Sequence, residues 1–186
     1  MKGESLHNHF LIAMPAMTDP NFARTVMLLC EHNEQGAMGL VINRPIDLQL
    51  LDVFSEVGID ADHAHDRETT VYFGGPVQTN RGFVVHEPAG HWDSTLRLGE
   101  SLGITTSRDV LQAIAEQRGP DRYLVTLGYA GWSPGQLERE IAENSWLHCP
   151  ADRAILFETP AEQRWQAAAL LVGVDLATLS GQAGHA

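Results

Sequence analysis

The sequence predicts a single domain of the α+β class. Short apolar runs typical of strands dominate the first half of the chain, and the second half adds segments that begin with helix-capping residues. Strand and helix signals do not alternate regularly, which favours antiparallel pairing over a doubly wound parallel sheet. A length of 186 residues with 44% hydrophobic and 19% charged residues is typical of one globular domain. We place this domain at residues 5–175 and expect 176–186 to form a flexible tail.

Strands are expected where apolar runs end at turn residues. Asn33 and Gly36 separate two such runs and predict a hairpin. The turn Gly74-Gly75-Pro76 separates two others in the same way, which predicts a second hairpin. The predicted strands cover residues 10–14, 25–32, 37–43, 70–73, 82–87, 123–129 and 154–157.

Helices are expected behind four capping signals. Asp47 can cap a helix that places Leu50, Leu51 and Phe54 on one face and ends near Gly58. The other three signals combine a hydroxyl residue with a polar residue three positions later, and two of them carry proline at the first helical position. These three signals are Thr106–Asp109, Ser133–Gln136 and Thr159–Glu162. The stretch 59–68 between the first two helices is polar and acidic and is expected to be a mobile loop.

The balance of charge argues against nucleic acid and membrane partners. Twelve Lys and Arg residues stand against 24 Asp and Glu, a net charge of −12, and the basic residues are scattered singly along the chain. Binding to DNA relies on clustered cations that neutralise phosphates, and an acidic protein is repelled by polyanions and by anionic lipid. Direct DNA binding is therefore the weakest of the function classes that we consider.

Cysteine usage and the N-terminal residues indicate a cytoplasmic protein. Only Cys30 and Cys149 are present, too few for a disulfide framework. The N-terminal segment lacks the long apolar core of a signal peptide, and no stretch has the roughly 20 apolar residues of a membrane span. The pairs Cys30/His32 and His148/Cys149 could supply metal ligands on paper, but neither has the spacing of a zinc site, so we expect no metal and no cofactor.

Several blocks of sequence resemble the AlgH/YqgE family of bacterial proteins. The most distinctive are FGGPVQTNRGFVVH at 73–86 and GYAGWSPGQLEREIAENSWL at 128–147. FLIAMPAMTDPNFARTV at 10–26, CEHNEQGAMGLVINRP at 30–45, TTSRDVL at 105–111 and ILF at 155–157 follow the same family in the same order. The resemblance implies a bifurcated, largely antiparallel sheet folded into a flattened pseudo-barrel with flanking helices. The family carries a label as a transcriptional regulator linked to alginate control, with no reaction assigned.

Polar residues at the ends of the predicted elements give a candidate binding site. Trp132 stands beside a helix start whose free N–H groups suit an anion, and arginines at strand ends could hold the same ligand. We expect a small anionic ligand where these connections meet, and the alternative is that the same residues are buried corners that tie loops to backbone carbonyls. The candidate residues are Asn43, Arg44, Arg81, Arg108, Trp132 and Gln136.

Other chemical readings of the sequence are weaker. The turn Gly74-Gly75-Pro76 lacks the lysine and the glycine spacing of a phosphate loop, so a tight strand connection is favoured. His86 could act as a general base, but a structural histidine is favoured. Cys149 lies beside His148, whose protonated ring could lower the pKa of the thiol, so Cys149 is a candidate reactive thiol, although an inert cysteine is favoured.

The sequence leaves three function classes open. The leading one is a non-enzymatic regulatory or adaptor protein that acts through a protein partner or a small ligand. The second is an enzyme that acts on a small anionic metabolite at the arginine-bearing loops, and the third is direct DNA binding.

Overall fold

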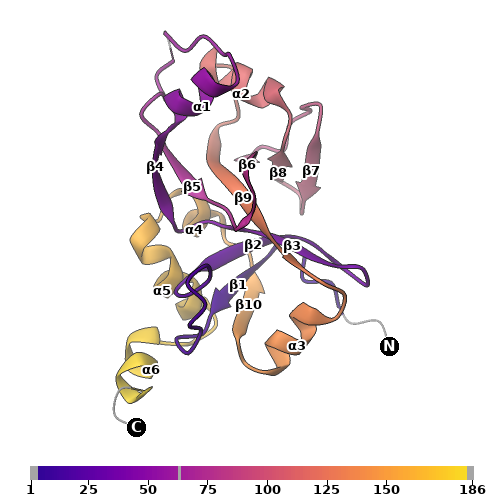
Figure 1. Ribbon diagram of the computed structural model, residues 1–186, viewed down its shortest axis with the longest axis vertical. Coiled ribbons are helices and arrows are strands. Elements are labelled where there is room, and N and C mark those ends of the chain that lie inside the picture. The colour runs from indigo at the N-terminus through magenta and orange to yellow at the C-terminus, as the bar shows by residue number, and fades with distance from the viewer. Residues whose placement is uncertain (1–3, 63, 184–186) are drawn as a thin grey trace.

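The computed structural model describes residues 4–62 and 64–183. These residues form one curled, largely antiparallel sheet with helices around it (Figure 1). The α+β class, the single domain and the curled sheet that the family resemblance implied are confirmed. The strands are β1 (His9–Ala13), β2 (Val26–Asn33), β3 (Gly36–Val41), β4 (Pro45–Gln49), β5 (Thr70–Phe73), β6 (Val77–Glu87), β7 (Thr95–Leu98), β8 (Leu102–Thr105), β9 (Arg122–Trp132) and β10 (Trp146–Pro150). The helices are α1 (Leu50–Glu56), α2 (Arg108–Ala115), α3 (Gln136–Ala142), α4 (Arg153–Phe157), α5 (Ala161–Leu171) and α6 (Leu176–Ala183).

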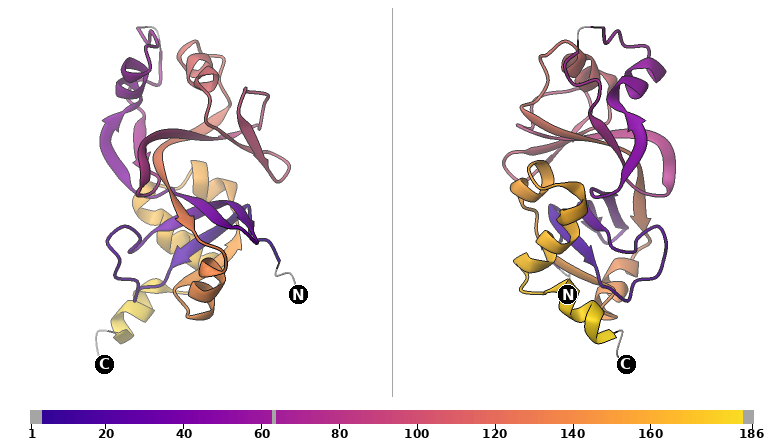
Figure 2. Two further views of the ribbon diagram at one scale, coloured as in Figure 1. Left: turned by 45° about the vertical axis from the view of Figure 1, so that its right-hand side comes forward. Right: turned by 90° about the vertical axis from the view of Figure 1, so that its left-hand side faces the viewer.

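The long strand β9 joins two lobes and explains why the sheet divides. One edge of β9 pairs with β6, from Gly82↔Leu127 to Glu87↔Arg122. The other edge pairs in its first half with β5, in parallel, and in its second half with β3, antiparallel. We call residues 45–115 the upper lobe, which carries α1 and α2, and residues 9–41 with 136–183 the lower lobe, which carries α3–α6. Figure 2 shows β9 passing from one lobe to the other.

The lower lobe is closed on both faces of its sheet. On one face α5 packs on β1, β2 and β10, and on the other α3 covers a cluster that includes Leu11, Met27 and Trp146. The guanidinium of Arg164, 4% exposed, donates to the carbonyl oxygens of Ile42 and Thr159 and lies 5.0 Å from the centre of the Tyr72 ring. These contacts hold α5 against the sheet because they satisfy backbone oxygens that burial has removed from water.

Local signals predicted the β2–β3 hairpin and the start of α2 correctly, but two other predictions are wrong. The runs 70–73 and 82–87 do not form a hairpin, since β9 lies between β5 and β6 and pairs with both. The glycines of the connecting turn instead approach β9, where a Cβ on Gly75 would lie 2.1 Å from the carbonyl carbon of Tyr129. The predicted strand 154–157 is the helix α4, because the Asp152 carboxylate caps it by accepting from the Ile155 N–H at 3.0 Å.

Two helix boundaries also differ from expectation. Asp47 lies within β4 and does not cap α1; the helix begins after Gln49, whose N–H donates to the Asp52 carboxylate at 2.8 Å. The segment expected as a tail begins as α6, and Leu176 is buried in the main core, which accounts for its helical start. Residues 184–186 lie outside the described residues.

Candidate functional site

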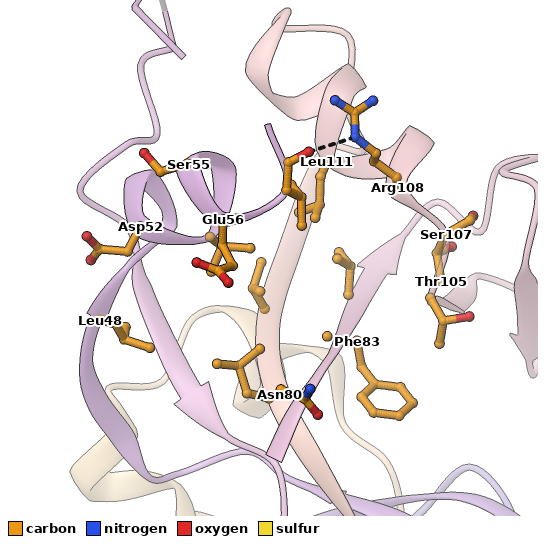
Figure 3. Close-up of a pocket in the computed structure, with 17 residues that line it drawn as sticks. Leu48, Asp52, Ser55, Glu56, Asn80, Phe83, Thr105, Ser107, Arg108 and Leu111 are labelled. Carbon is orange, nitrogen blue, oxygen red and sulfur yellow. Dashed lines mark hydrogen bonds between the residues drawn. The ribbon is translucent and has the colours of Figure 1, made fainter. Parts of the chain in front are cut away.

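A cleft lies between α1 and α2 in the upper lobe. The two helices stand side by side above β6 and β9 (Figure 1) and enclose a cavity of about 600 Å³ (Figure 3). This volume is in the range of sites that hold small ligands or a few side chains. The helices of the upper lobe therefore leave a hollow between them, whereas the helices of the lower lobe pack directly on their sheet.

The walls and floor of the cleft are mainly apolar. Val53 and Val57 from α1 face Leu111 from α2, and Val84, Val125 and Leu127 form the floor. Val84 and Val125 also belong to the buried cluster that supports both helices, so the floor is part of the packed core of this lobe. Binding of a ligand that removes an apolar surface of this kind from water is favourable.

The N-terminus of α2 lies where the sequence predicted it, but the hydrogen bonds differ from the predicted capping by Thr106. Ser107 is the N-cap residue, its side chain makes no capping bond to the helix backbone, and its hydroxyl donates to the Asp109 carboxylate at 2.6 Å. The other oxygen of Asp109 accepts from the Asp93 N–H at 2.8 Å, and the Ser107 hydroxyl oxygen accepts from the Ser94 N–H at 3.0 Å. The negative charge of Asp109 thus already occupies the helix end that would otherwise attract an anion.

The rim of the cleft carries more acidic than basic side chains. Asp52 and Glu56 come from α1, and Arg108 comes from α2. The Arg108 guanidinium donates to the carbonyl oxygens of Val57 and Gly58, each at 3.1 Å, and so caps the C-terminal end of α1 (Figure 3). Its hydrogen bonds join the two walls at one end and leave the carboxylates of α1 unneutralised by this arginine.

A buried histidine lies beside the cleft. The His86 ring, 0% exposed, donates from Nδ1 to the Pro88 carbonyl oxygen at 2.9 Å, so its Nε2 accepts from the Thr105 hydroxyl at 2.7 Å. The Thr105 hydroxyl lies 2.8 Å from that of Thr95 and is turned away from α1 (Figure 3). Burial lowers the pKa of His86, with a smaller opposing effect from Pro88. A base beside a hydroxyl is the geometry of a catalytic pair, but here both groups are buried and serve to join β6, β8 and β7.

Of the candidate residues, Arg108 lines the cleft and Arg81 lies near it on the opposite face of the sheet. Arg81 borders a second hollow of about 590 Å³ with Glu31, Met38 and Tyr129, and its guanidinium lies 5.3 Å from the centre of the Phe83 ring. Two carboxylates, Glu31 and Asp93, border the same hollow. Arg81 and Arg108 are therefore not brought together around one ligand.

Asn43 and Arg44 serve as loop anchors. The Arg44 guanidinium donates to the carbonyl oxygens of Pro20, Asn21 and Ala23 at 2.7–2.8 Å. The Asn43 amide accepts from the Val26 N–H at 3.0 Å and donates to the Arg24 oxygen at 2.9 Å. The alternative considered from the sequence, that arginines tie loops to backbone carbonyls, describes this corner.

Trp132 and Gln136 belong to the packing beneath α3. The indole N–H groups of Trp132 and Trp146 both donate to the Glu140 carboxylate, at 3.1 and 3.0 Å. Gln136 donates to the same carboxylate at 2.8 Å and accepts from the Ser133 N–H at 2.9 Å. Gln136 lies in the lower lobe and Trp132 at the end of β9 that leads into it, and both are apart from Arg108 and Arg81.

The cysteines lie in the main core. Burial raises the pKa of both thiols, and for Cys149 the charge of Asp152 adds to the effect. The adjacent His148 therefore does not give Cys149 the lowered pKa that reactivity requires, which supports the inert interpretation. Within residues 4–62 and 64–183, no group of three or more His, Cys, Asp or Glu side chains is arranged to hold a metal ion.

Most residues that form the cleft were not predicted from the sequence as site residues, Glu56, Gly82 and Leu111 among them. The available signal was an excess of apolar residues around α1. Leu48, Leu51 and Val57 remain 37–40% exposed, more than a helix that only covers a core requires.

The fold and the cleft define a single-domain α+β protein with one divided sheet and a helix-walled hollow. The chain belongs to the AlgH-like family, which matches residues 10–177. It is 58% identical to a UPF0301 protein of Pseudomonas aeruginosa over 97% of this chain and 96% of that one, and 55% identical to a UPF0301 protein of Nitrosococcus oceani over 96% of each. The solution structure of the AlgH protein from Pseudomonas aeruginosa, 55% identical, superposes over 100% of both chains with a TM-score of 0.81.

A more distant protein shares the fold. A crystal structure from Corynebacterium diphtheriae, 24% identical, covers 97% of this chain and 94% of its own with a TM-score of 0.76. In the described part of the chain, none of the helices combines the length and the apolar character needed to cross a bilayer.

Proposed function

We propose that this protein is a non-enzymatic, cytoplasmic adaptor or regulator that acts by binding a partner in the α1–α2 cleft. The observation that carries the proposal is the open cavity of about 600 Å³ between α1 and α2, whose walls and floor are mainly apolar, unlike the second hollow, which Arg81 and two carboxylates border. A gene-regulatory role fits an indirect route through a partner, because the net charge of −12 opposes contact with DNA.

The positions of the polar groups support binding over catalysis in this cleft. The histidine nearest to it donates and accepts hydrogen bonds within the sheet and has no exposed surface. Arg44, a residue expected to hold an anionic substrate, uses its donors on three backbone carbonyls. The apolar walls remain as the feature that a partner would recognise.

Gly82 offers a way to fill the cleft without disturbing the sheet. A Cβ at this position would meet only the Leu127 Cδ2 atom, at 3.9 Å, and Gly82 faces the cleft from β6. Gly131 is the matched control, since it lies in an exposed part of β9 and a Cβ there would meet only Tyr129, at 3.8 Å. Gly82→Val should occupy the cavity, and Gly131→Val should leave it open.

The experiment compares the proteins that co-purify with the tagged full-length chain from its own cells. We expect a defined partner to be retained by the wild type and by Gly131→Val and to be lost with Gly82→Val, while circular dichroism shows that all three are folded. Equal recovery with Gly82→Val and the wild type would show that the cleft is not the binding site.

A further inference from the structure

We propose that the cleft binds a short, basic amphipathic segment of a partner protein, whose apolar side chains enter the cavity while a Lys or Arg pairs with Glu56. This inference rests on the proposed binding function of the cleft and specifies the chemistry of its occupant. Three features of the upper lobe support it: the extent of the apolar surface, the charge of the rim and the size of the hollow.

The apolar surface of the cleft is partly open to water. Leu48 and Val57, 38% and 37% exposed, flank α1 in the chain, and both line the cleft. Leu51, 40% exposed, adds to the apolar surface of the same helix. A small metabolite held inside the cavity would leave Leu51 in water, whereas a peptide that lies along α1 would cover it together with the two lining residues.

The charge of the rim favours a cation. Glu56 extends from α1 over the cleft (Figure 3) and has no ion-pair partner in the part of the chain that the structure describes. Asp52 adds a second carboxylate, one oxygen of which accepts from the Gln49 N–H. The opposing arginine, Arg108, directs its donors to the carbonyls at the end of α1. A positively charged side chain at the rim would therefore gain an ion pair without displacing an existing one.

An anionic occupant has no matching group in the cleft. The N-terminal end of α2 already holds the carboxylate of Asp109. Arg81 borders the hollow on the other face of the sheet, and the exposed Arg108 directs its donors to carbonyl oxygens at the end of α1. The net charge of −12 would in addition attract a basic segment and speed its association.

The size of the cavity fits the side chains of a short segment. About 600 Å³ is enough for a few side chains. The walls are short, since α1 has 7 residues and α2 has 8. Recognition by a few anchoring side chains on one face of a short peptide is a common mode of binding in helix-walled grooves.

The test uses three acetylated and amidated peptides of about twelve residues that share one helical pattern of leucines. Their polar positions are all lysine, all glutamine or all glutamate. Each is titrated into the ¹⁵N-labelled full chain, and amide shifts of Val53, Val84 and Leu111 report binding in the cleft. Glu56→Gln removes the rim charge, and Glu143→Gln, an exposed carboxylate in the lower lobe, is the matched control.

We expect the lysine peptide to bind about tenfold more tightly than the glutamine peptide at low salt, and the glutamate peptide to bind most weakly. Glu56→Gln should reduce the preference for lysine several-fold, added salt should weaken it, and Glu143→Gln should retain it. Equal affinity of all three peptides at the cleft would contradict the inference that the occupant is basic, while the proposal that the cleft binds a partner would stand.

Two further outcomes would overturn the inference in other ways. A preference for lysine that Glu143→Gln reduces as much as Glu56→Gln would show that net charge, and not the rim, selects the peptide. Shifts confined to residues outside the cleft, or no shifts with any peptide, would reject the segment as occupant. In that case the co-purification with Gly82→Val separately decides whether the cleft binds another kind of partner.

Discussion

Each lobe has a helix whose arginine binds backbone carbonyl oxygens, but the contact closes the lower lobe and leaves the upper lobe open. In the lower lobe Arg164 of α5 is buried and donates to the carbonyl oxygens of Ile42, which follows β3, and of Thr159, so that the helix closes over the core. In the upper lobe Arg108 of α2 is exposed and binds carbonyl oxygens at the end of the neighbouring helix. A buried arginine thus fixes a helix onto the sheet, whereas an exposed one joins two helices and leaves a hollow between them.

The largest expected effect is the loss of the buried arginine. Arg164→Ala leaves the oxygens of Ile42 and Thr159 without their donor and opens a cavity beside Tyr72. We expect the free energy of unfolding to fall by about 3 kcal/mol. Arg108→Ala should cost about 1 kcal/mol, because water can replace the lost donor at exposed carbonyls. Urea unfolding of both variants measures the difference, and equal losses would contradict the contrast between the lobes.

The second effect is a loss of stability in acid to which a buried histidine of the upper lobe contributes. Because burial lowers the pKa of His86, the unfolded chain binds more protons than the native one below its ordinary pKa of about 6.5. The stability from neutral His86 is present above about pH 6.5 and is lost as the pH falls toward the native pKa, by at most about 1.4 kcal/mol for each pH unit. His9 contributes with the same sign, since burial and then His148 lower its pKa.

Urea unfolding between about pH 7 and pH 5.5 checks this pH dependence. His86→Gln should unfold at lower urea than the wild type but show a smaller decrease between the two pH values. His91→Gln, which changes an exposed histidine, is the control and should keep the full decrease. A decrease in His86→Gln as large as in the wild type would assign the acid sensitivity to other groups.

The contrast between the lobes also shows what the sequence could predict. The positions of the β2–β3 hairpin and of the start of α2 depend on neighbouring residues, Asn33–Gly36 and Thr106–Asp109, and were predicted correctly, although Ser107 and not Thr106 is the N-cap residue of α2. The separation of β5 and β6 was not predicted, because it depends on β9, whose residues follow about fifty positions later in the chain.

The cleft was beyond local prediction for the same reason. Its walls come from residues 48–57 and 105–111 and its floor from 80–84 and 125–127, so only the folded chain brings them together. Of the six candidate ligand residues, Arg108 reaches the cleft, whereas Asn43, Arg44, Trp132 and Gln136 hold loops and helices and Arg81 borders the second hollow. Polar residues at element ends were predicted as ligands, but most of them satisfy backbone and carboxylate groups instead.

The smallest expected effect is on the stability of the variant that fills the cleft. Gly82→Val adds apolar contact with Leu127 and restricts the unfolded chain, and we expect a gain of up to about 0.5–1 kcal/mol. Gly131→Val, in an exposed part of β9, should gain less, because its side chain contacts only Tyr129. Thermal unfolding of the two variants measures this, and a clear loss in Gly82→Val would show that the cleft cannot accept a side chain at its floor.

The most direct test of the cleft as a binding site is photo-cross-linking from its rim. A benzophenone amino acid replaces Leu48 at the cleft or Leu170, 56% exposed, on α5 of the lower lobe, and the tagged protein is irradiated in its own cells. If the cleft is the binding site, we expect one dominant cross-linked partner from position 48 that is absent from position 170 and is lost when Gly82→Val is added. The same cross-links from both positions, or cross-links from position 48 that persist with Gly82→Val, would contradict it.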